Sequence, residues 1–136
     1  MKMKLKLLEI LQWTGLLLGA GIWIVQHILG SGVTQAVCGA GGAHWGIQHD
    51  LWQALLMGFA AGFVLVAQAA AITVYSATRE VDFGDGSPDE AHWNGELPMS
   101  RMHFFAAGAI VANTLFFFII LLDGFASIFN VTCRQG

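Results

Sequence analysis

The stretch LLEILQWTGLLLGAGIWIVQHIL, residues 7–29, decides the fold class of this chain. It is longer than the roughly 20 apolar residues that a helix needs to cross a bilayer, and Glu9 is its only formally charged residue. Two further apolar runs of sufficient length follow, at residues 51–75 and 102–129. We therefore expect three transmembrane helices, at about residues 7–30, 51–77 and 101–130.

The composition of the whole chain supports this interpretation. Of its 136 residues, 56% are hydrophobic and 11% are charged, with a mean hydropathy of +0.64, whereas a soluble domain carries about 25% charged residues. We expect a single all-α transmembrane domain over residues 1–136. The first run exceeds the apolar region of about 7–15 residues in a secretory signal peptide, so we expect it to be retained as a helix.

The positions of the basic residues predict the orientation. Lysine and arginine accumulate in the cytoplasmic segments of membrane proteins, and here they precede the first helix and bracket the second connection, as Lys2, Lys4, Lys6, Arg79 and Arg101. The amino terminus and the acidic loop 78–100 are therefore expected in the cytoplasm. An up-down-up bundle in a bacterial inner membrane then has its outer loop 31–50 and its carboxyl-terminal tail in the periplasm.

Both cysteines fall on the predicted periplasmic side. Cys38 lies in the outer loop and Cys133 lies beyond the third helix, and the bacterial periplasm allows disulfides to form. A disulfide between Cys38 and Cys133 is the first interpretation. A copper or zinc site built from Cys38, His44 and His49 is a second, because thiolate and imidazole suit both metals, and two unpaired thiols are a third.

Polar residues inside the apolar runs indicate where the helices meet. His27 lies near the outer end of the first run, and Asn113 and Asp123 lie within the third. An ionisable group facing lipid is costly, so Asp123 is expected to have a partner, and His27 is the partner that we predict. His27 and His49, expected at one depth, also raise the possibility of a haem b with two histidine ligands. The alternative is a pair of interfacial histidines that bond to neighbouring groups.

Small residues predict close packing of the helices. The sequences GLLLG (15–19) and GFAAG (58–62) each carry glycines four residues apart, and the third run offers small residues of the same kind, at Gly108 and Ala112. Such residues let helix backbones approach closely in lipid. The pairs Gly15/Gly19 and Gly58/Gly62 could face one another, or one pair could face another subunit.

The sequence shows no nucleophile with a base, no paired carboxylates and no phosphate-binding glycine loop, so we expect no catalytic site. The acidic loop 78–100 favours neither nucleic acid nor anionic lipid as a partner. It is expected to be a solvated linker, or alternatively a docking strip for a basic partner that His92 and Trp93 would anchor.

A resemblance follows from three of these features: GLLLGAGIWIVQHILGSGVTQAVC (15–38), the arginine-bearing loop after the second helix, and RMHFFAAGAIVANTLFFFIILLDGFASIFNVTC (101–133). Together they resemble a family of small three-helix bacterial membrane proteins encoded beside haem-copper cytochrome c oxidase genes. The acidic loop is longer than the connection expected in that family. The resemblance implies an accessory subunit or assembly partner of a terminal oxidase, a Cys38–Cys133 pair, and Gln26 and His27 as the polar end of the first helix.

The function expected from the sequence is therefore that of a non-catalytic scaffold subunit of a respiratory membrane complex, with no cofactor of its own. Its partners would be a larger complex, such as a terminal oxidase or a respiratory supercomplex, and lipids. The outer face would present His44, Trp45 and the tail to a periplasmic partner. The alternatives are a haem-bearing electron-transfer anchor, which uses His27 and His49, and a copper-handling assembly factor, which uses Cys38 and His44.

Overall fold

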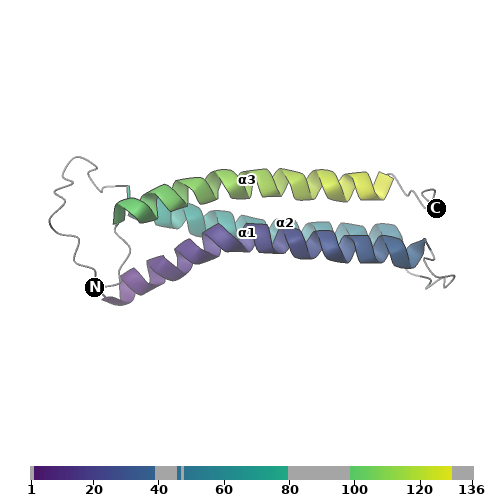
Figure 1. Cartoon of the computed structure of the whole chain (residues 1–136), viewed down its shortest axis with the longest axis horizontal. Helices are drawn as coiled ribbons and strands as arrows, with labels where there is room; N and C mark the ends of the chain where they lie inside the picture. The colour runs from purple at the N-terminus through teal and green to yellow at the C-terminus, as the bar shows by residue number, and fades with distance from the viewer. Residues whose placement is uncertain (1, 39–45, 47, 80–98, 130–136) are drawn as a thin grey trace.

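The protein is an elongated bundle of three long helices (Figure 1). The computed structural model describes residues 2–38, 46, 48–79 and 99–129, and only the backbone of residues 2–5 and 99–100. These residues form α1 (Lys2–Val37), α2 (His49–Ala77) and α3 (Met99–Phe129). The three helices are long and apolar enough to span a membrane, over Lys6–Val37, His49–Ala77 and Arg101–Phe129. The prediction of three apolar helices of transmembrane length is confirmed.

Local sequence explains why these segments stay helical and where α2 ends. The two prolines of the chain, Pro88 and Pro98, fall outside all three helices, and proline is the residue that disrupts a helix interior most. At the end of α2, the backbone N–H and the hydroxyl of Thr78 both donate to the carbonyl of Val74, at 3.0 and 2.9 Å. This carbonyl would otherwise be left without an intrahelical partner.

The first helix runs further than its apolar stretch predicts. The sequence places the outer loop at residues 31–50, but α1 continues to Val37 and α2 already begins at His49. Gly30 and Thr34 explain the extension, because the Thr34 hydroxyl donates to the Gly30 carbonyl at 3.0 Å and stays within the helix. The length of an apolar run reports the thickness of the hydrocarbon layer, and a helix can continue beyond that layer.

Neighbouring helices in the chain run antiparallel. Along α1 and α2, Gly15 meets Ala71 near one end, and Gly30 bonds to Gln53 near the other. Along α2 and α3, the Thr78 hydroxyl lies 3.1 Å from Nδ1 of His103. At the other end of that pair Gly124 packs against Met57.

The first and third helices run in the same direction. The carbonyl of Gly15 accepts a hydrogen bond from Asn113, and His27 contacts Asp123. These pairs are separated by 98 and 96 residues, so the two helices keep nearly one register over this length. One end of the bundle, here called the Lys6 end, holds the start of α1 and α3. The opposite end is called the Cys38 end.

The interior of the bundle is made of small side chains. Alanines dominate the buried apolar positions, with a few larger residues among them: Ala60, Val64, Ala67, Ala70, Ala71, Val74, Met102, Ala106, Ala109 and Ile120. Large aromatic and aliphatic side chains lie outside instead, such as Phe59, Phe104 and Leu122. In lipid, helices associate through close backbone packing, because apolar burial gives no net drive there.

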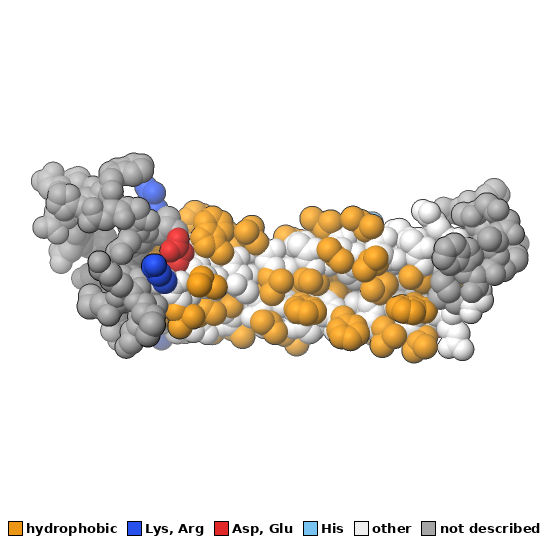
Figure 2. Space-filling model, turned by 90° about the horizontal axis from the view of Figure 1, so that it is seen from below, with side chains coloured by type: hydrophobic (Ala, Val, Ile, Leu, Met, Phe, Trp, Pro, Cys, Tyr) orange, Lys and Arg blue, Asp and Glu red, His pale blue; other side chains and the backbone are white. Residues whose placement is uncertain are grey.

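The outer surface changes character along the long axis. Figure 2 shows hydrophobic side chains over the length of the helices, while Lys, Arg, Asp and Glu side chains gather near one end of the described part. Trp13 and Trp52, each 48% exposed, lie toward the Lys6 end and the Cys38 end respectively. Tryptophan is enriched where a helix leaves the hydrocarbon layer, so this spacing fits a bundle that spans a bilayer lengthwise.

Candidate functional site

A contact between a histidine and an aspartate joins α1 and α3 near the Cys38 end. His27 Nδ1 lies 3.4 Å from Asp123 Oδ2, with the imidazole side chain 58% exposed and the carboxylate 34% exposed. Trp23 lies one turn earlier on α1, with its ring centroid 6.0 Å from that of His27. The prediction that His27 is the partner of Asp123 is confirmed by this contact.

A polar crevice opens beside the His27–Asp123 pair. It has a volume of about 250 Å³ and lies between α1 and α3, where its lining consists of His27, Gly30, Ser31, Thr34, Gln35, Asp123 and Ser127. Hydroxyl, amide, imidazole and carboxylate groups share one small space there. His27 and Asp123 were predicted from the sequence, but the hydroxyl groups beside them were not. The spacing in the sequence could have indicated them. Ser31 lies four residues after His27, and Ser127 lies four residues after Asp123, so each serine shares a helix face with the residue before it.

His49 lies deeper in the bundle than its place at a loop edge suggested. Its side chain is 7% exposed, its Nδ1 lies 3.2 Å from Asp50 Oδ1, and its Nε2 lies 3.3 Å from the Thr34 hydroxyl. Both ring nitrogens are therefore engaged with neighbouring side chains. Gln53 continues this cluster by donating to the Gly30 carbonyl at 3.0 Å and to the Thr34 hydroxyl at 3.3 Å.

The two histidines proposed as haem ligands do not lie at one depth. His49 is level with Thr34, and Thr34 follows His27 by seven residues on α1, about 10 Å along the helix axis. The expectation of one depth is wrong because α1 continues seven residues past its predicted end at residue 30, and His49 of α2 then lies beside Thr34. The arrangement of His27 and His49 does not fit the haem alternative, which needs both imidazoles on one iron.

The other predicted outer residues can be placed only in part. His44, Trp45, His92, Trp93 and Cys133 lie outside the described residues, so the copper site and the docking strip stay predictions. Within the described residues, no group of three or more His, Cys, Asp or Glu side chains could hold a metal ion.

The cysteine pairing also stays a prediction, because Cys133 lies outside the described residues. Cys38 follows the last residue of α1, and its backbone N–H bonds to the Thr34 carbonyl at 2.9 Å. Cys38 and Cys133 are 95 residues apart in the sequence. Contacting residues of α1 and α3 are separated by 96 and 98 residues, which is nearly the same offset.

A buried amide fastens the middle of the bundle. Asn113 is 1% exposed, and its Nδ2 donates to the Gly15 carbonyl at 2.8 Å. The same side chain fills the space beside Gly19, where a Cβ atom would overlap its oxygen. The sequence analysis named Asn113 as an intramembrane polar residue but not its partner, because a backbone carbonyl leaves no signal in the sequence.

The glycines divide into a packed group and an open group. A Cβ atom on Gly15 would lie 3.0 Å from the backbone nitrogen of Ala71, and one on Gly124 would lie 2.5 Å from Met57 Sδ. In contrast, Gly58, Gly62 and Gly108 have no such neighbour within 4 Å. The alternative in which Gly15 and Gly19 face Gly58 and Gly62 is therefore wrong, because Ala71 and Asn113 occupy that side of α1. Ala112 is half-buried.

The open glycines of α2 lie in an apolar groove. This groove, here called the α2 groove, has a volume of about 450 Å³ and is lined by Ala54, Leu55, Gly58, Phe59, Gly62, Phe63 and Val66. Ala54, Gly58 and Gly62 follow one another at intervals of four residues and so lie on one face of the helix. Phe59 and Phe63 stand beside them, 67% and 48% exposed.

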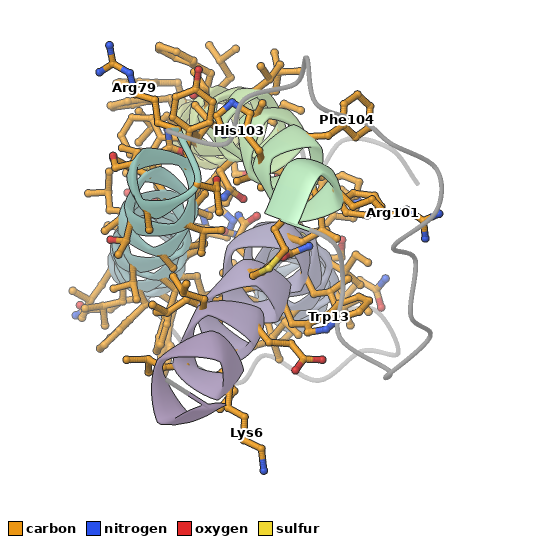
Figure 3. All side chains as sticks on the ribbon, turned by 90° about the vertical axis from the view of Figure 1, so that its left-hand side faces the viewer. Lys6, Trp13, Arg79, Arg101, His103 and Phe104 are labelled. Atoms are coloured by element: carbon orange, nitrogen blue, oxygen red, sulfur yellow. The ribbon has the colours of Figure 1, made fainter. Side chains whose placement is uncertain are left out.

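A polar cluster that the sequence analysis missed closes the Lys6 end. His103 of α3 stacks on Tyr75 with ring centroids 4.3 Å apart, and its Nδ1 lies 3.1 Å from the Thr78 hydroxyl. Lys6, Arg79 and Arg101 point outward around this end (Figure 3). The cluster joins α2 to α3 beside these basic residues, and His103 follows Thr78 by 25 residues in the sequence.

No protein-family model matches the chain, and no curated protein or solved structure is significantly similar to it.

Proposed function

We propose that this protein is a non-catalytic accessory subunit that docks, through the α2 groove, against a transmembrane helix of a larger membrane complex. The contrast among its glycines carries the proposal. Neighbouring residues occupy the space beside Gly15, Gly19 and Gly124. In contrast, the space beside Gly58 and Gly62 is open and forms part of a groove of about 450 Å³. A groove floored by small residues and walled by phenylalanines suits another helix, because small residues allow close backbone approach in lipid.

The orientation belongs to the same proposal. The basic residues Lys6, Arg79 and Arg101 surround one end of the bundle, and basic residues favour the cytoplasmic side. The amino terminus and residues 78–100 then lie in the cytoplasm, and the three helices cross a bacterial inner membrane up, down and up. The Cys38 end and the tail lie in the periplasm, where Cys38 and Cys133 form a disulfide.

The partner complex that we propose is a haem-copper cytochrome c oxidase. This identification rests on the sequence resemblance described above, which covers α1, α3 and the cysteine positions. The proposal assigns the chain no redox role of its own, because the positions of His27 and His49 do not fit a shared haem.

Co-purification of the native complex in mild detergent tests the proposal. The chain should be recovered with oxidase subunits, identified by mass spectrometry and by a haem-copper oxidase spectrum. The double variant Gly58→Leu/Gly62→Leu fills the α2 groove and should lose this association. It should keep the fold of the free chain, because neither glycine has a neighbour within 4 Å.

Gly108→Leu is the matched control. Gly108 is also open, with no neighbour within 4 Å, but lies on α3 and away from the groove. This variant should keep the association. Equal recovery of oxidase subunits with wild type and with the filled groove would reject the groove as the docking surface. Recovery of the wild-type chain only as a free protein would reject the accessory role itself.

A further inference from the structure

Among the described residues, the carboxylate of Asp123 has one hydrogen-bond partner, His27. Its Oδ2 contacts His27 at 3.4 Å, which is a long hydrogen bond, and its Oδ1 has no donor among the described residues. The side chain is 34% exposed and lines the polar crevice. An acidic group at membrane depth is stabilised by a partner, and this oxygen is free to accept a hydrogen bond from a ligand in the crevice.

No basic side chain of the described helices supplies that donor. Lys2, Lys4, Lys6, Arg79 and Arg101 all belong to the Lys6 end of the bundle. Asp123 lies six residues before the end of α3, at the opposite end. Among the described residues, the crevice is lined by one carboxylate and by no Lys or Arg side chain, so the ligand that it favours is a cation with N–H donors.

The remaining groups of the crevice lie toward the Cys38 end from Asp123. Ser31 and Gln35 follow His27 by one and two turns, about 6 and 12 Å along the axis. Their hydroxyl and amide oxygens can accept further hydrogen bonds from such a cation. Trp52 is exposed on α2 three residues after His49. Because such tryptophans lie near the lipid headgroups, the crevice opens at headgroup depth.

We propose that the polar crevice binds the headgroup of phosphatidylethanolamine through its primary ammonium, which Asp123 accepts as a hydrogen-bond donor. Phosphatidylcholine has the same charges, but its trimethylated nitrogen carries no N–H. Phosphatidylglycerol lacks the cation and brings a negative charge toward Asp123.

Lipid retention measured by native mass spectrometry tests the proposal. The full chain is placed in nanodiscs that contain equal amounts of phosphatidylethanolamine, phosphatidylcholine and phosphatidylglycerol, and the lipids that stay bound on release are counted. Wild type should retain one phosphatidylethanolamine in preference to the other two. Asp123→Asn should reduce this preference about tenfold, the scale of losing one charge-assisted hydrogen bond.

Two further variants test whether the lipid preference depends on the crevice itself or on the loss of any carboxylate at the Cys38 end. Asp50→Asn removes another carboxylate at the Cys38 end, 73% exposed and outside the crevice, and should leave the preference unchanged. Ser127→Leu narrows the crevice while keeping Asp123, and it should weaken retention even if Asp123→Asn fails to fold. Equal retention of phosphatidylcholine and phosphatidylethanolamine by wild type would overturn the proposal.

A last variant concerns Arg134 of the chain itself, which lies outside the described residues. Arg134→Gln should leave the preference for phosphatidylethanolamine intact. If that preference arises only in this variant, the tail arginine and not a lipid is the partner of Asp123, and the proposal fails. The α2 groove takes no part in these measurements, so their outcome is independent of the docking experiment.

Discussion

At the scale of single residues, buried amides and hydroxyls hold the bundle together more specifically than apolar side chains do. Asn113 joins α3 to the backbone of α1, and Gln53 joins α2 to the same helix near the Cys38 end. Each amide donates to a backbone carbonyl, at Gly15 and Gly30, where the absence of a side chain lets it approach. Glycine therefore contributes twice, through close packing and through an accessible acceptor.

Asn113→Ala should destabilise the bundle. The variant removes the 2.8 Å hydrogen bond to Gly15 and leaves a space beside Gly19, so we expect a loss of about 0.6–1.7 kcal/mol, the range measured for hydrogen bonds between membrane helices. Reversible unfolding in mixed micelles measures this free energy. Thr114→Ala is the control, because the Thr114 hydroxyl bonds only to Ile110 of its own helix. A similar loss in both variants would contradict the specific role of Asn113.

The polar residues also show how far a sequence can predict contacts. His27 and Asp123 could be paired because two ionisable groups in apolar runs have few other partners. Asn113 and Gln53 bond to backbone carbonyls, which every residue carries, so their partners could not be identified from the sequence.

At the scale of helices, α2 has two different faces. Its inner face buries alanines and valines against the other two helices, and its outer face carries the α2 groove. The lengths of the apolar runs predicted that α2 exists and where it ends, but not which face turns inward. A helix that is apolar all round has no polar side to orient it, so Gly15 and Gly58 look equivalent in sequence and differ only in the structure.

Gly15→Val should weaken the packing of α1 on α2. Its added side chain would meet the backbone of Ala71, starting with a Cβ atom 3.0 Å from the nitrogen, and a backbone cannot move aside as a flexible side chain can. We expect a loss of about 1–3 kcal/mol, as for other overpacked sites. Gly21→Val on the same helix has open space around it and serves as the control. Equal unfolding free energies in the two variants would show that the α1–α2 contact tolerates separation.

At the scale of the whole molecule, the common direction of α1 and α3 brings distant parts of the chain to the same level. The offset of 96 and 98 residues between contacting positions is close to the 95 residues between the cysteines. The sequence alone predicted a disulfide from the side of the membrane on which each cysteine lies. Cys133 lies outside the described residues, so the pairing itself stays a prediction.

Mass spectrometry of the unreduced protein should find Cys38 and Cys133 joined. Reduction, or the variant Cys38→Ser, should then lower the unfolding free energy by less than about 4.7 kcal/mol, the chain-entropy value for a loop of this length, because inserted helices have already lost much of their freedom. Two thiols that react with maleimide in the untreated protein would contradict the pairing.

Reporter fusions test the orientation of the whole molecule. Alkaline phosphatase folds only in the periplasm, because it requires disulfides. A fusion after Gly136 should therefore be active, and a fusion after Pro88 in the acidic loop should be inactive. Exchange of Lys2, Lys4 and Lys6 for glutamine should reduce this asymmetry, because these lysines contribute to the positive-inside bias. The reverse pattern of activities would invert the assignment of both ends.

The division between a small-residue interior and a bulky exterior bears on how such a chain can change over generations. Exposed residues such as Leu122 and Phe104 touch little of the chain itself, so exchanges among them leave the fold nearly unaffected. Interior positions such as Gly15 and Gly19 allow almost no exchange, since any added atom meets a neighbour. Substitutions can therefore accumulate among the exposed residues and adapt the surface to a new partner, while the packing of the interior residues is kept.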